Sequence, residues 1–321
     1  MSDGGPAVKI VDQHELMHEF EADLEKRITG KYQRWPTGIE ELDNLLAGGG
    51  FQPGQFVVLG GRTSHGKSAL GLQLALDWGI MGARVVMTPY EMTPLQGANR
   101  WIVQHPENKT ITYDQINRPE GLTPDFHDAM FQLGAKIADL PFHNIVGNPP
   151  AHTLVERVKG LCDLGKCDIL IVDYVQLVQS QGIPPGHLRE AMIQLMAHLK
   201  NLAVREKIVV VALSQLSRGA AGTEHRPQLN HLQESGALEQ VADVALLLWR
   251  PAQDGEGLAG SRRVEIGRGD WGRGTKFVTE EYTELGLKKN RFGPTGTIYM
   301  SFDPAHQRFF PAHRDSNTTS E

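Results

Sequence analysis

Six short apolar runs, rich in Val, Ile and Leu, alternate with stretches of helical character between residues 55 and 250. The runs do not alternate between apolar and polar positions, so we expect both faces of each strand to be buried, as in parallel sheets. The sequence therefore predicts an α/β fold in which a mainly parallel sheet is sandwiched between helices. The runs are QFVVLG, ARVVMTPY, FHNIVG, CDILIVDYVQLV, KIVVVALSQL and DVALLLWR.

The pattern changes at both ends of the chain. Residues 9–30 carry apolar side chains at mostly helical spacing, which predicts an amphipathic helix that packs on its own core or on a neighbouring subunit. After residue 251, turns rich in Gly and Arg and hairpin-like strands indicate an antiparallel extension. We expect an N-terminal helix in residues 1–32, a main domain in 33–311 and a polar, disordered tail in 312–321.

Composition adds constraints but does not decide the function. The formal net charge is -6 and the isoelectric point is near 6.1, which argues against a generally basic surface but leaves room for a local nucleic-acid groove. Cys162 and Cys167 are the only cysteines; without a second pair of ligands at metal-binding spacing they are expected to be reduced thiols. No signal peptide or membrane span is apparent, so we expect a cytoplasmic protein with no membrane partner.

Residues 61–68, GRTSHGKS, match the phosphate-loop pattern G-x-x-x-x-G-K-[ST] between a predicted strand and a predicted helix. Gly61 and Gly66 permit backbone conformations that point N–H groups inward, and the helix amino terminus favours anions. Lys67 is expected to reach the β and γ phosphates of a nucleotide, and Ser68 to bind Mg²⁺. A chance glycine-rich turn is the alternative. The loop is completed by Arg62, Thr63, Ser64 and His65.

Three polar residues lie at the ends of other predicted strands. Asp173 closes a buried strand, where a carboxylate needs a metal or hydrogen-bond donors, and it is our candidate Walker B residue. Glu91 follows the run VVMTPY and is placed to polarise the attacking water. Gln215 ends a further strand and could sense the γ phosphate. The alternatives are a capping role for Asp173, a solvated loop acid for Glu91 and a simple polar strand end for Gln215.

Longer motifs resemble replicative DNA helicases of the DnaB type. They are WPTGIEELDNLLAGGGFQPGQFVVLGGRTSHGKSA, PYEM, ILIVDYVQL, VVALSQLSR, RPQLNHLQESGALEQVADVALLLWR and KKNRFGPTGTIYMSFDP, in the family's order. The resemblance covers roughly residues 33–311 and implies a RecA-like P-loop motor domain. It also implies a hexameric ring around single-stranded DNA, ATP bound between neighbouring subunits, Glu91 as the catalytic carboxylate, and primase and a helicase loader as partners. The shortness of the segment before WPTG predicts that the family's N-terminal collar is missing, as would suit a phage or mobile-element helicase.

The resemblance also places basic residues at the ATP site. Lys289 and Arg291, in LKKNRFGPTG, match the pair that the next subunit inserts across the interface, where a guanidinium stabilises charge on the transferring phosphoryl group. Arg250 matches a family arginine near the nucleotide. From the residues alone, a solvated basic strand edge and a surface salt bridge are the alternatives.

For DNA contact, the resemblance points to the loop before LEQ, where Gln233 stands in place of a usual arginine. Losing one phosphate-neutralising charge per subunit should weaken DNA binding and reduce its salt dependence. Arg218 and Arg226 flank the preceding glycine-containing loop and could compensate. The predicted DNA-binding residues are Arg218, Arg226, Gln233, Glu234, Ser235 and Gly236.

Residues 261–276 form a basic segment that looks longer than the family's usual connection. Five basic residues against two acidic ones give an excess of +3, and Trp271 could stack on a base; a solvated β-hairpin is the alternative. The basic residues of this segment are Arg262, Arg263, Arg268, Arg273 and Lys276.

Two other functions also stay open: a RecA- or RadA-like strand-exchange ATPase, and a non-translocating regulator with a KaiC-like core.

Overall fold

The computed structural model describes residues 11–118, 120, 123–177, 188–216, 226–232, 240–254, 263–264, 276–277 and 282–311. The chain divides into two compact units, Met1–Arg34 and Trp35–Glu321, and each is described by itself. The predicted tail, residues 312–321, lies outside the described residues.

The first unit contains one helix, α1 (Gln13–Ile28), within its described part. The Asp12 side chain caps its amino end by accepting a hydrogen bond from the backbone N–H of Glu15 at 2.9 Å. Lys26 and Arg27 lie in the last turn, where positive charge offsets the negative end of the helix dipole. The helix buries none of its residues. Its large apolar side chains are all exposed: Leu16, Met17, Phe20, Leu24 and Ile28.

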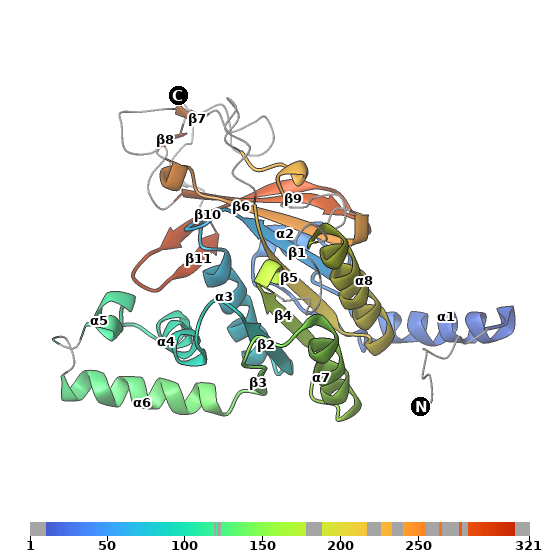
Figure 1. Cartoon of the computed structure of the whole chain (residues 1–321), viewed down its shortest axis with the longest axis horizontal. Coiled ribbons are helices and arrows are strands. Elements are labelled where there is room, and N and C mark those ends of the chain that lie inside the picture. The colour runs from blue at the N-terminus through green and yellow to red at the C-terminus, as the bar shows by residue number, and fades with distance from the viewer. Residues whose placement is uncertain are drawn as a thin grey trace. The chain divides into compact units, whose positions relative to one another are not determined.

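The second unit is built on one sheet, in which nine described strands follow the order β11-β10-β9-β6-β1-β5-β4-β2-β3 (Figure 1). All six predicted apolar runs form strands, and these strands pair in parallel. They are β1 (Phe56–Gly61), β2 (Val85–Pro89), β3 (Phe142–Asn144), β4 (Ile169–Asp173), β5 (Val209–Gln215) and β6 (Val244–Trp249). The predicted fold class is confirmed.

The antiparallel extension is also confirmed. Strand β9 (Tyr282–Asn290) pairs with β6, and β10 (Gly296–Asp303) and β11 (Arg308–Pro311) continue the sheet. Two short strands, β7 (Arg263–Val264) and β8 (Lys276–Phe277), pair separately. The remaining residues of the predicted basic segment 261–276 lie outside the described part of the chain.

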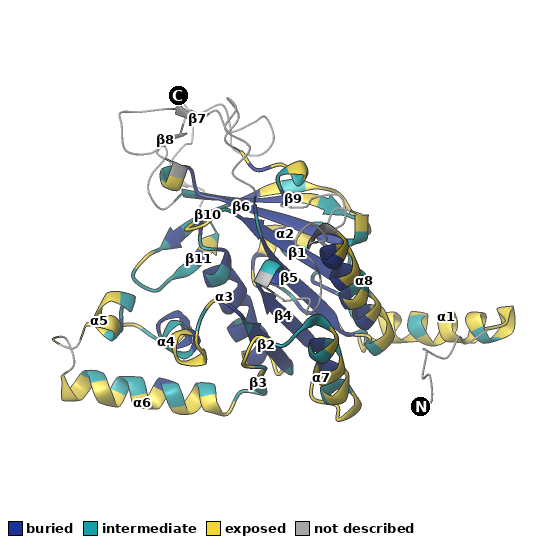
Figure 2. Cartoon of the chain, in the orientation of Figure 1, coloured by how far each residue is buried: buried dark blue, intermediate teal, exposed yellow. Residues whose placement is uncertain are grey.

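Helices cover both faces of the parallel strands (Figure 2). Strands β1, β4 and β6 are buried along their whole length, and β2 and β5 are buried except at their last residue, whereas β3 at the end of the strand order has no buried residue. Successive residues of β1 face opposite layers, since Val57 and Leu59 belong to one hydrophobic cluster and Phe56 and Val58 to the other. The first cluster includes α3 (Lys67–Ile80) and part of α4 (Pro94–Gln104), and the second includes α7 (Ala151–Asp163) and α8 (Leu188–Glu206). The other helices are α2 (Glu40–Leu45), α5 (Tyr113–Asn117), α6 (Pro124–Ala138) and the 3-10 turns η2 (Val175–Leu177), η3 (Leu229–His231) and η4 (Pro251–Asp254).

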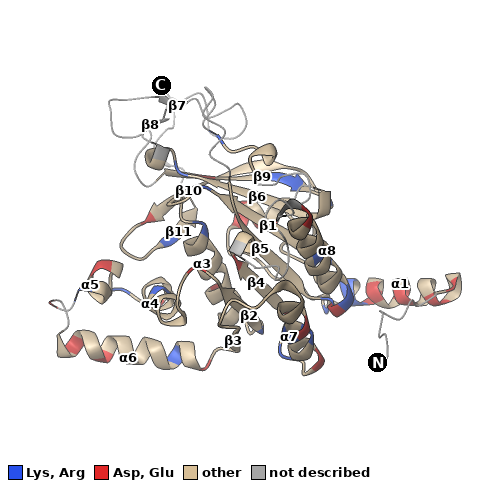
Figure 3. Cartoon of the chain, viewed as in Figure 1, with Lys and Arg blue, Asp and Glu red and all other residues tan. Residues whose placement is uncertain are grey.

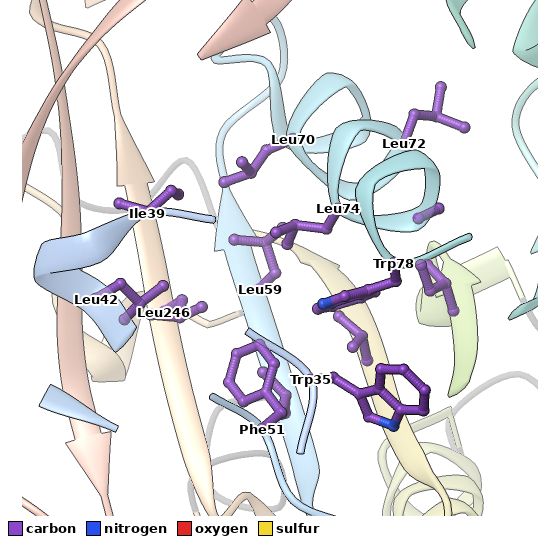
Figure 4. Packing of buried hydrophobic residues seen from close by; sticks show 14 of the residues in the cluster. Trp35, Ile39, Leu42, Phe51, Leu59, Leu70, Leu72, Leu74, Trp78 and Leu246 are labelled. Atoms are coloured by element: carbon purple, nitrogen blue, oxygen red, sulfur yellow. The ribbon is translucent and has the colours of Figure 1, made fainter. Parts of the chain in front are cut away.

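The packing of α3 on the sheet fixes the residues that begin this helix. Figure 4 shows Leu70, Leu74 and Trp78 of α3 turned toward Leu59 of β1. The Trp78 indole N–H donates to the carbonyl of Pro36 at 2.7 Å, so this polar group is satisfied although the ring is buried. Because most residues of α3 are buried, its packing in this layer holds its amino terminus against the end of β1.

Two expectations from composition can be compared with the described residues. Cys162 and Cys167 are both free, in agreement with the prediction of reduced thiols. None of the helices in the described ranges is both long and apolar enough to cross a bilayer.

Candidate nucleotide site

The phosphate loop joins β1 to α3, and its backbone has positive φ at two positions. Ser64 has φ 67° and Gly66 has φ 92°, which lie in the left-handed region that glycine adopts without a steric penalty. Gly61 instead continues β1, and a Cβ there would meet the Cβ of Lys67 at 3.4 Å. The turn is therefore made at Ser64 and Gly66, while Gly61 leaves room for Lys67.

His65 and Arg250 tie the loop to the end of the neighbouring strand β6. The His65 ring is buried, and its Nδ1 accepts a hydrogen bond from the backbone N–H of Arg250 at 3.0 Å. The guanidinium carbon of Arg250 lies 4.2 Å from the centre of the Phe302 ring, within cation–π range. Arg250 is itself buried, so the surface salt bridge considered from the sequence does not describe its environment.

A cavity of about 520 Å³ opens beside the loop. Its volume is in the range of small-molecule sites, and three predicted site residues from outside the loop, Glu91, Gln215 and Arg250, line it. The predicted loop residues that line the cavity are Arg62, Thr63, Ser64, Gly66, Lys67 and Ser68. The structure therefore brings most of the predicted nucleotide-binding residues together around one cavity. His65 holds the loop through its hydrogen bond with the backbone of Arg250.

Lys67 lies against Asp173, which ends β4. The Nζ of Lys67 is 3.5 Å from Oδ1 of Asp173, and their side chains are only 8% and 4% exposed. The Lys67 Nζ also lies 4.8 Å from the centre of the Tyr174 ring. Burial, together with the nearby charges of Glu91 and Asp173, raises the pKa of Tyr174. The positive charge of Lys67 at the amino terminus of α3 therefore lies beside the Asp173 carboxylate.

Ser68 and Asp173 are the oxygen ligands predicted for Mg²⁺. In the described residues, no three or more His, Cys, Asp or Glu side chains form a metal-binding group. Mg²⁺ that binds with a nucleotide retains water and phosphate oxygens and takes only one or two carboxylates from the protein. The donor set therefore fits a nucleotide-bound Mg²⁺ and does not fit a closed cage of protein ligands.

Gln215 connects the loop to the end of β5. Its Nε2 donates to Oγ1 of Thr63 at 2.8 Å, and its backbone N–H donates to Oε1 of Gln176 at 3.3 Å. Gln176 in turn donates to Oγ of Ser214 at 2.9 Å. Glu91, after β2, is exposed and lines the cavity. A water between Glu91 and a bound γ phosphate would have this carboxylate as its acceptor.

The far wall of the cavity comes from residues that sequence reasoning did not single out. They project from α4, from α5 and from the β10 to β11 hairpin, none of which carries a nucleotide-binding motif. The guanidinium carbon of Arg100 lies 5.7 Å from the centre of the Tyr113 ring, and the backbone N–H of Tyr113 donates to the carbonyl of Ala305 at 2.7 Å. Together with Tyr174 after β4, these residues are Gln96, Arg100, Tyr113, Phe302 and Gln307.

Lys289 and Arg291 lie at the opposite edge of the sheet. Asn290 between them is in register with Val244 at the start of β6, which is in register with Val57 of β1. Four residues of β1 separate Val57 from Gly61, or roughly 13 Å along a strand. Figure 3 shows the basic residues on β9 in blue. The two side chains contact the Gln240 carbonyl and do not line the cavity of their own chain.

Comparisons with known proteins identify the family of this chain. The model of the DnaB-like helicase C-terminal domain matches residues 35–311. The chain belongs to this family. The replicative DNA helicase DnaB of Treponema pallidum is 30% identical over 85% of this chain and 55% of its own length, and a probable replicative DNA helicase of Trieres chinensis is 28% identical over 85% and 56%. The chain thus spans just over half of these relatives.

Solved structures show the same fold. A DnaB-like replicative helicase that interacts with primase superposes with a TM-score of 0.74 at 23% identity, over 96% of this chain and 69% of its own. A solved ATPase domain superposes with a TM-score of 0.77 at 23% identity, over 95% of this chain and all of that domain. The phosphate loop, strand β4 and the antiparallel extension therefore lie in a fold that this chain shares with both solved structures.

The DNA-contact residues predicted for this DnaB-like chain are only partly described. Arg218 and the stretch Gln233, Glu234, Ser235 and Gly236 lie outside the described residues. Arg226 is described, and its Nη2 is 2.9 Å from Oε1 of Glu284 on β9, while its guanidinium carbon lies 5.4 Å from the centre of the Trp249 ring. Arg226 therefore has intramolecular partners with which DNA phosphates would compete.

Gly66→Ala is expected to lower nucleotide affinity tenfold or more. The Cβ would stand 2.8 Å from Cζ of Phe309, at φ 92°, so the loop must shift and its N–H groups lose their alignment with the phosphates. Gly82→Ala is the matched control, because Gly82 has φ 89° with nothing within 4 Å of the added Cβ. Both variants should lose about 1–2 kcal/mol of unfolding free energy from left-handed strain. Titration with a fluorescent ATP analogue would measure the nucleotide affinity of each variant, and thermal unfolding would measure its stability. Equal nucleotide affinities of Gly66→Ala and Gly82→Ala would contradict the prediction.

Proposed function

We propose that this chain is an ATP-driven DNA helicase motor that forms a hexameric ring, translocates on single-stranded DNA and unwinds duplex. One observation carries the proposal. In a DnaB-like domain, an assembled phosphate site lies at one edge of the sheet, while the basic pair Lys289 and Arg291 lies at the other edge. Two copies placed side by side would bring the pair of one to the cavity of the next. A half-site on each edge favours a head-to-tail assembly of identical subunits, and such an assembly forms a ring when the rotation between neighbours closes.

The phosphate loop would bind ATP through its N–H groups and through Lys67. Ser68 and Asp173 would hold Mg²⁺, which when bound neutralises phosphate charge. Asp173 contacts Lys67 now, so binding of ATP would turn the ammonium toward phosphate while a metal takes over the carboxylate. The charges of Lys67 and Asp173 would then each lie beside an opposite charge, both with and without nucleotide.

Glu91 would accept a proton from the attacking water. Gln215 reaches Oγ1 of Thr63 on the loop, and Arg218 follows it by three positions in the sequence. Loss of the γ phosphate would change the loop's contacts, and Gln215 would pass that change along the chain to Arg218. ATP hydrolysis at the phosphate loop and DNA binding would then be coupled through the Gln215 side chain.

Two further interactions complete the proposal. The exposed apolar stripe of α1 would dock on a neighbouring copy, since a helix with such a face and no buried residues needs a partner surface. Arg226, with Arg218 and the stretch from Gln233 to Gly236, would contact the DNA backbone. The family resemblance suggests primase and a helicase loader as protein partners.

A forked DNA substrate tests the proposal directly. We expect unwinding that depends on ATP and Mg²⁺, hydrolysis stimulated by single-stranded DNA, and ring-shaped six-membered particles around DNA density in electron microscopy. Lys67→Ala is the control that should lose all nucleotide-dependent activity. Filaments that exchange strands without unwinding would favour the RecA-like or RadA-like alternative. Hydrolysis indifferent to DNA, with no DNA binding at low salt, would favour the KaiC-like regulator and end the helicase proposal.

A further inference from the structure

Asp243 is a buried carboxylate that collects contacts from three separate elements. It precedes β6 and is 2% exposed. Its Oδ2 accepts from the backbone N–H of Phe56 at 2.8 Å and lies 2.5 Å from Nζ of Lys200 on α8. Its Oδ1 lies 3.3 Å from Nη1 of Arg291. A carboxylate this deep is stable as an anion only when such donors and cations surround it.

Arg291 contacts Asp243 through its backbone as well as through its side chain. Its backbone N–H donates to the Asp243 carbonyl at 2.9 Å, and its Nη2 donates to the Gln240 carbonyl at 3.0 Å. The side chain is nonetheless 46% exposed. The guanidinium has five N–H donors, and these contacts engage one donor on Nη1 and one on Nη2, which leaves three donors for a further partner.

Hydrogen bonds of Asn290 also stabilise the turn that carries Arg291. Asn290 donates through Nδ2 to the carbonyls of Leu45 and Pro294, each at 3.0 Å, and accepts from the backbone N–H of Phe292 at 3.2 Å. These contacts fix the backbone of the turn. The long Arg291 side chain, with several rotatable bonds, depends on Asp243 and Gln240 for its own order.

We propose that Asp243 is a positioning residue that holds Arg291 ready for the ATP site of the neighbouring subunit. The inference rests on the proposed function, because it takes Arg291 to act in trans. A guanidinium anchored by a charged hydrogen bond loses its rotamer freedom before the subunits meet, so it need not be ordered during each turnover. Lys200 contacts the second carboxylate oxygen, so Asp243 keeps a cationic partner when Arg291 engages phosphate.

Asp243→Asn tests the role, since it retains the shape and the acceptor for Phe56 but removes the charge. We expect turnover to fall roughly tenfold to a hundredfold, the scale of a small misplacement of a catalytic group, with ATP affinity unchanged because the phosphate loop is intact. Asp168→Asn is the matched control. Asp168 lies at the same edge of the sheet, is buried, and accepts from the backbone N–H and Nε of Arg84 at 2.8 and 2.7 Å. Its partner Arg84 is not a predicted site residue, so the control should leave turnover unchanged.

Subunit mixing separates positioning from a general loss of structure. Asp243→Asn is co-purified through a tag with Lys67→Ala, whose own pocket is inactive but whose Arg291 is correctly held, and basal hydrolysis is measured without DNA. Turnover above the sum of the two separate variants is expected, since Asp243→Asn pockets then meet well-positioned arginines. Asp243→Glu, which keeps the charge but displaces it, should show the same rescue and replaces the Asn variant if that does not fold.

The outcomes distinguish this inference from the proposed function. If Arg291→Ala mixed with Lys67→Ala gains activity but both Asp243 variants do not, Asp243 has only a structural role and the trans site stands. If Arg291→Ala gains none either, the trans site itself is wrong. Wild-type or faster turnover of Asp243→Asn alone would also overturn the inference, the latter because it would mean that Asp243 restrains Arg291.

Discussion

Glu91→Gln is expected to bind ATP with wild-type affinity and to lose hydrolysis by about 10²–10⁴-fold, the contribution of a positioned general base. The side chain lines the cavity at the end of β2, next to the end of β4, where Pro89 is in register with Asp173. The amide keeps the size of the carboxylate and cannot accept the proton. Nucleotide titration and steady-state hydrolysis, measured on one preparation, would separate binding from chemistry.

Glu107→Gln is the control for the loss of one negative charge. Glu107 is exposed, follows α4 and contacts Lys136, so its removal should leave hydrolysis unchanged and barely affect stability. Wild-type turnover by Glu91→Gln would mean that another group activates the water. A parallel loss of ATP binding would instead place Glu91 in binding, and would contradict its assignment as the base.

Arg291→Ala is expected to abolish turnover in its own oligomer, by about 10³-fold or more, while each subunit still binds ATP. An arginine supplied across an interface is worth this much in phosphoryl transfer, and Arg291 lies at the edge of the sheet away from its own cavity. Mixing with Lys67→Ala should restore part of the activity, because the Lys67→Ala subunit donates an intact arginine to a pocket that still binds nucleotide.

Lys288→Ala provides the control from the same strand. Lys288 is adjacent to Lys289 on β9, so the variant loses the same charge from the same region and should retain turnover. A loss equal to that of Arg291→Ala would point to general electrostatics at this edge. No rescue in a demonstrably mixed oligomer would contradict action in trans.

Local sequence was sufficient for the elements that hold the nucleotide. Uninterrupted apolar runs are typical of parallel strands that are buried on both faces, and β1, β4 and β6 are such strands. The short run that forms β3 is parallel too, although none of its residues is buried. The phosphate loop could be located to the residue because its function requires a glycine at φ 92° and a lysine at the start of a helix. Such features depend on neighbours in the chain.

Contacts between distant segments could not be obtained in this way. The Lys67 to Asp173 pair joins residues 106 positions apart, and the hydrogen bond from Arg250 to His65 spans 185. Both contacts exist because β1 lies between β5 and β6, with β4 next to β5. This order of strands in the sheet cannot be predicted from the sequence of any one strand. The cavity wall formed by Arg100, Tyr113 and Phe302 also depends on tertiary structure. The helices and the hairpin that carry these residues have no nucleotide-binding motif, and they come together only when the chain folds.

The sequence by itself determined a parallel α/β sheet and predicted a phosphate loop on it, because loop chemistry and strand burial are local properties. The family resemblance assigned Lys289 and Arg291 to the site of a neighbouring subunit, but only the tertiary structure showed that they lie away from the cavity of their own chain and that Arg291 contacts Asp243. The reason is physical: the antiparallel pairing of β9 with β6 brings the end of β9 beside the start of β6. Only that register separates the two halves of the proposed ATP site.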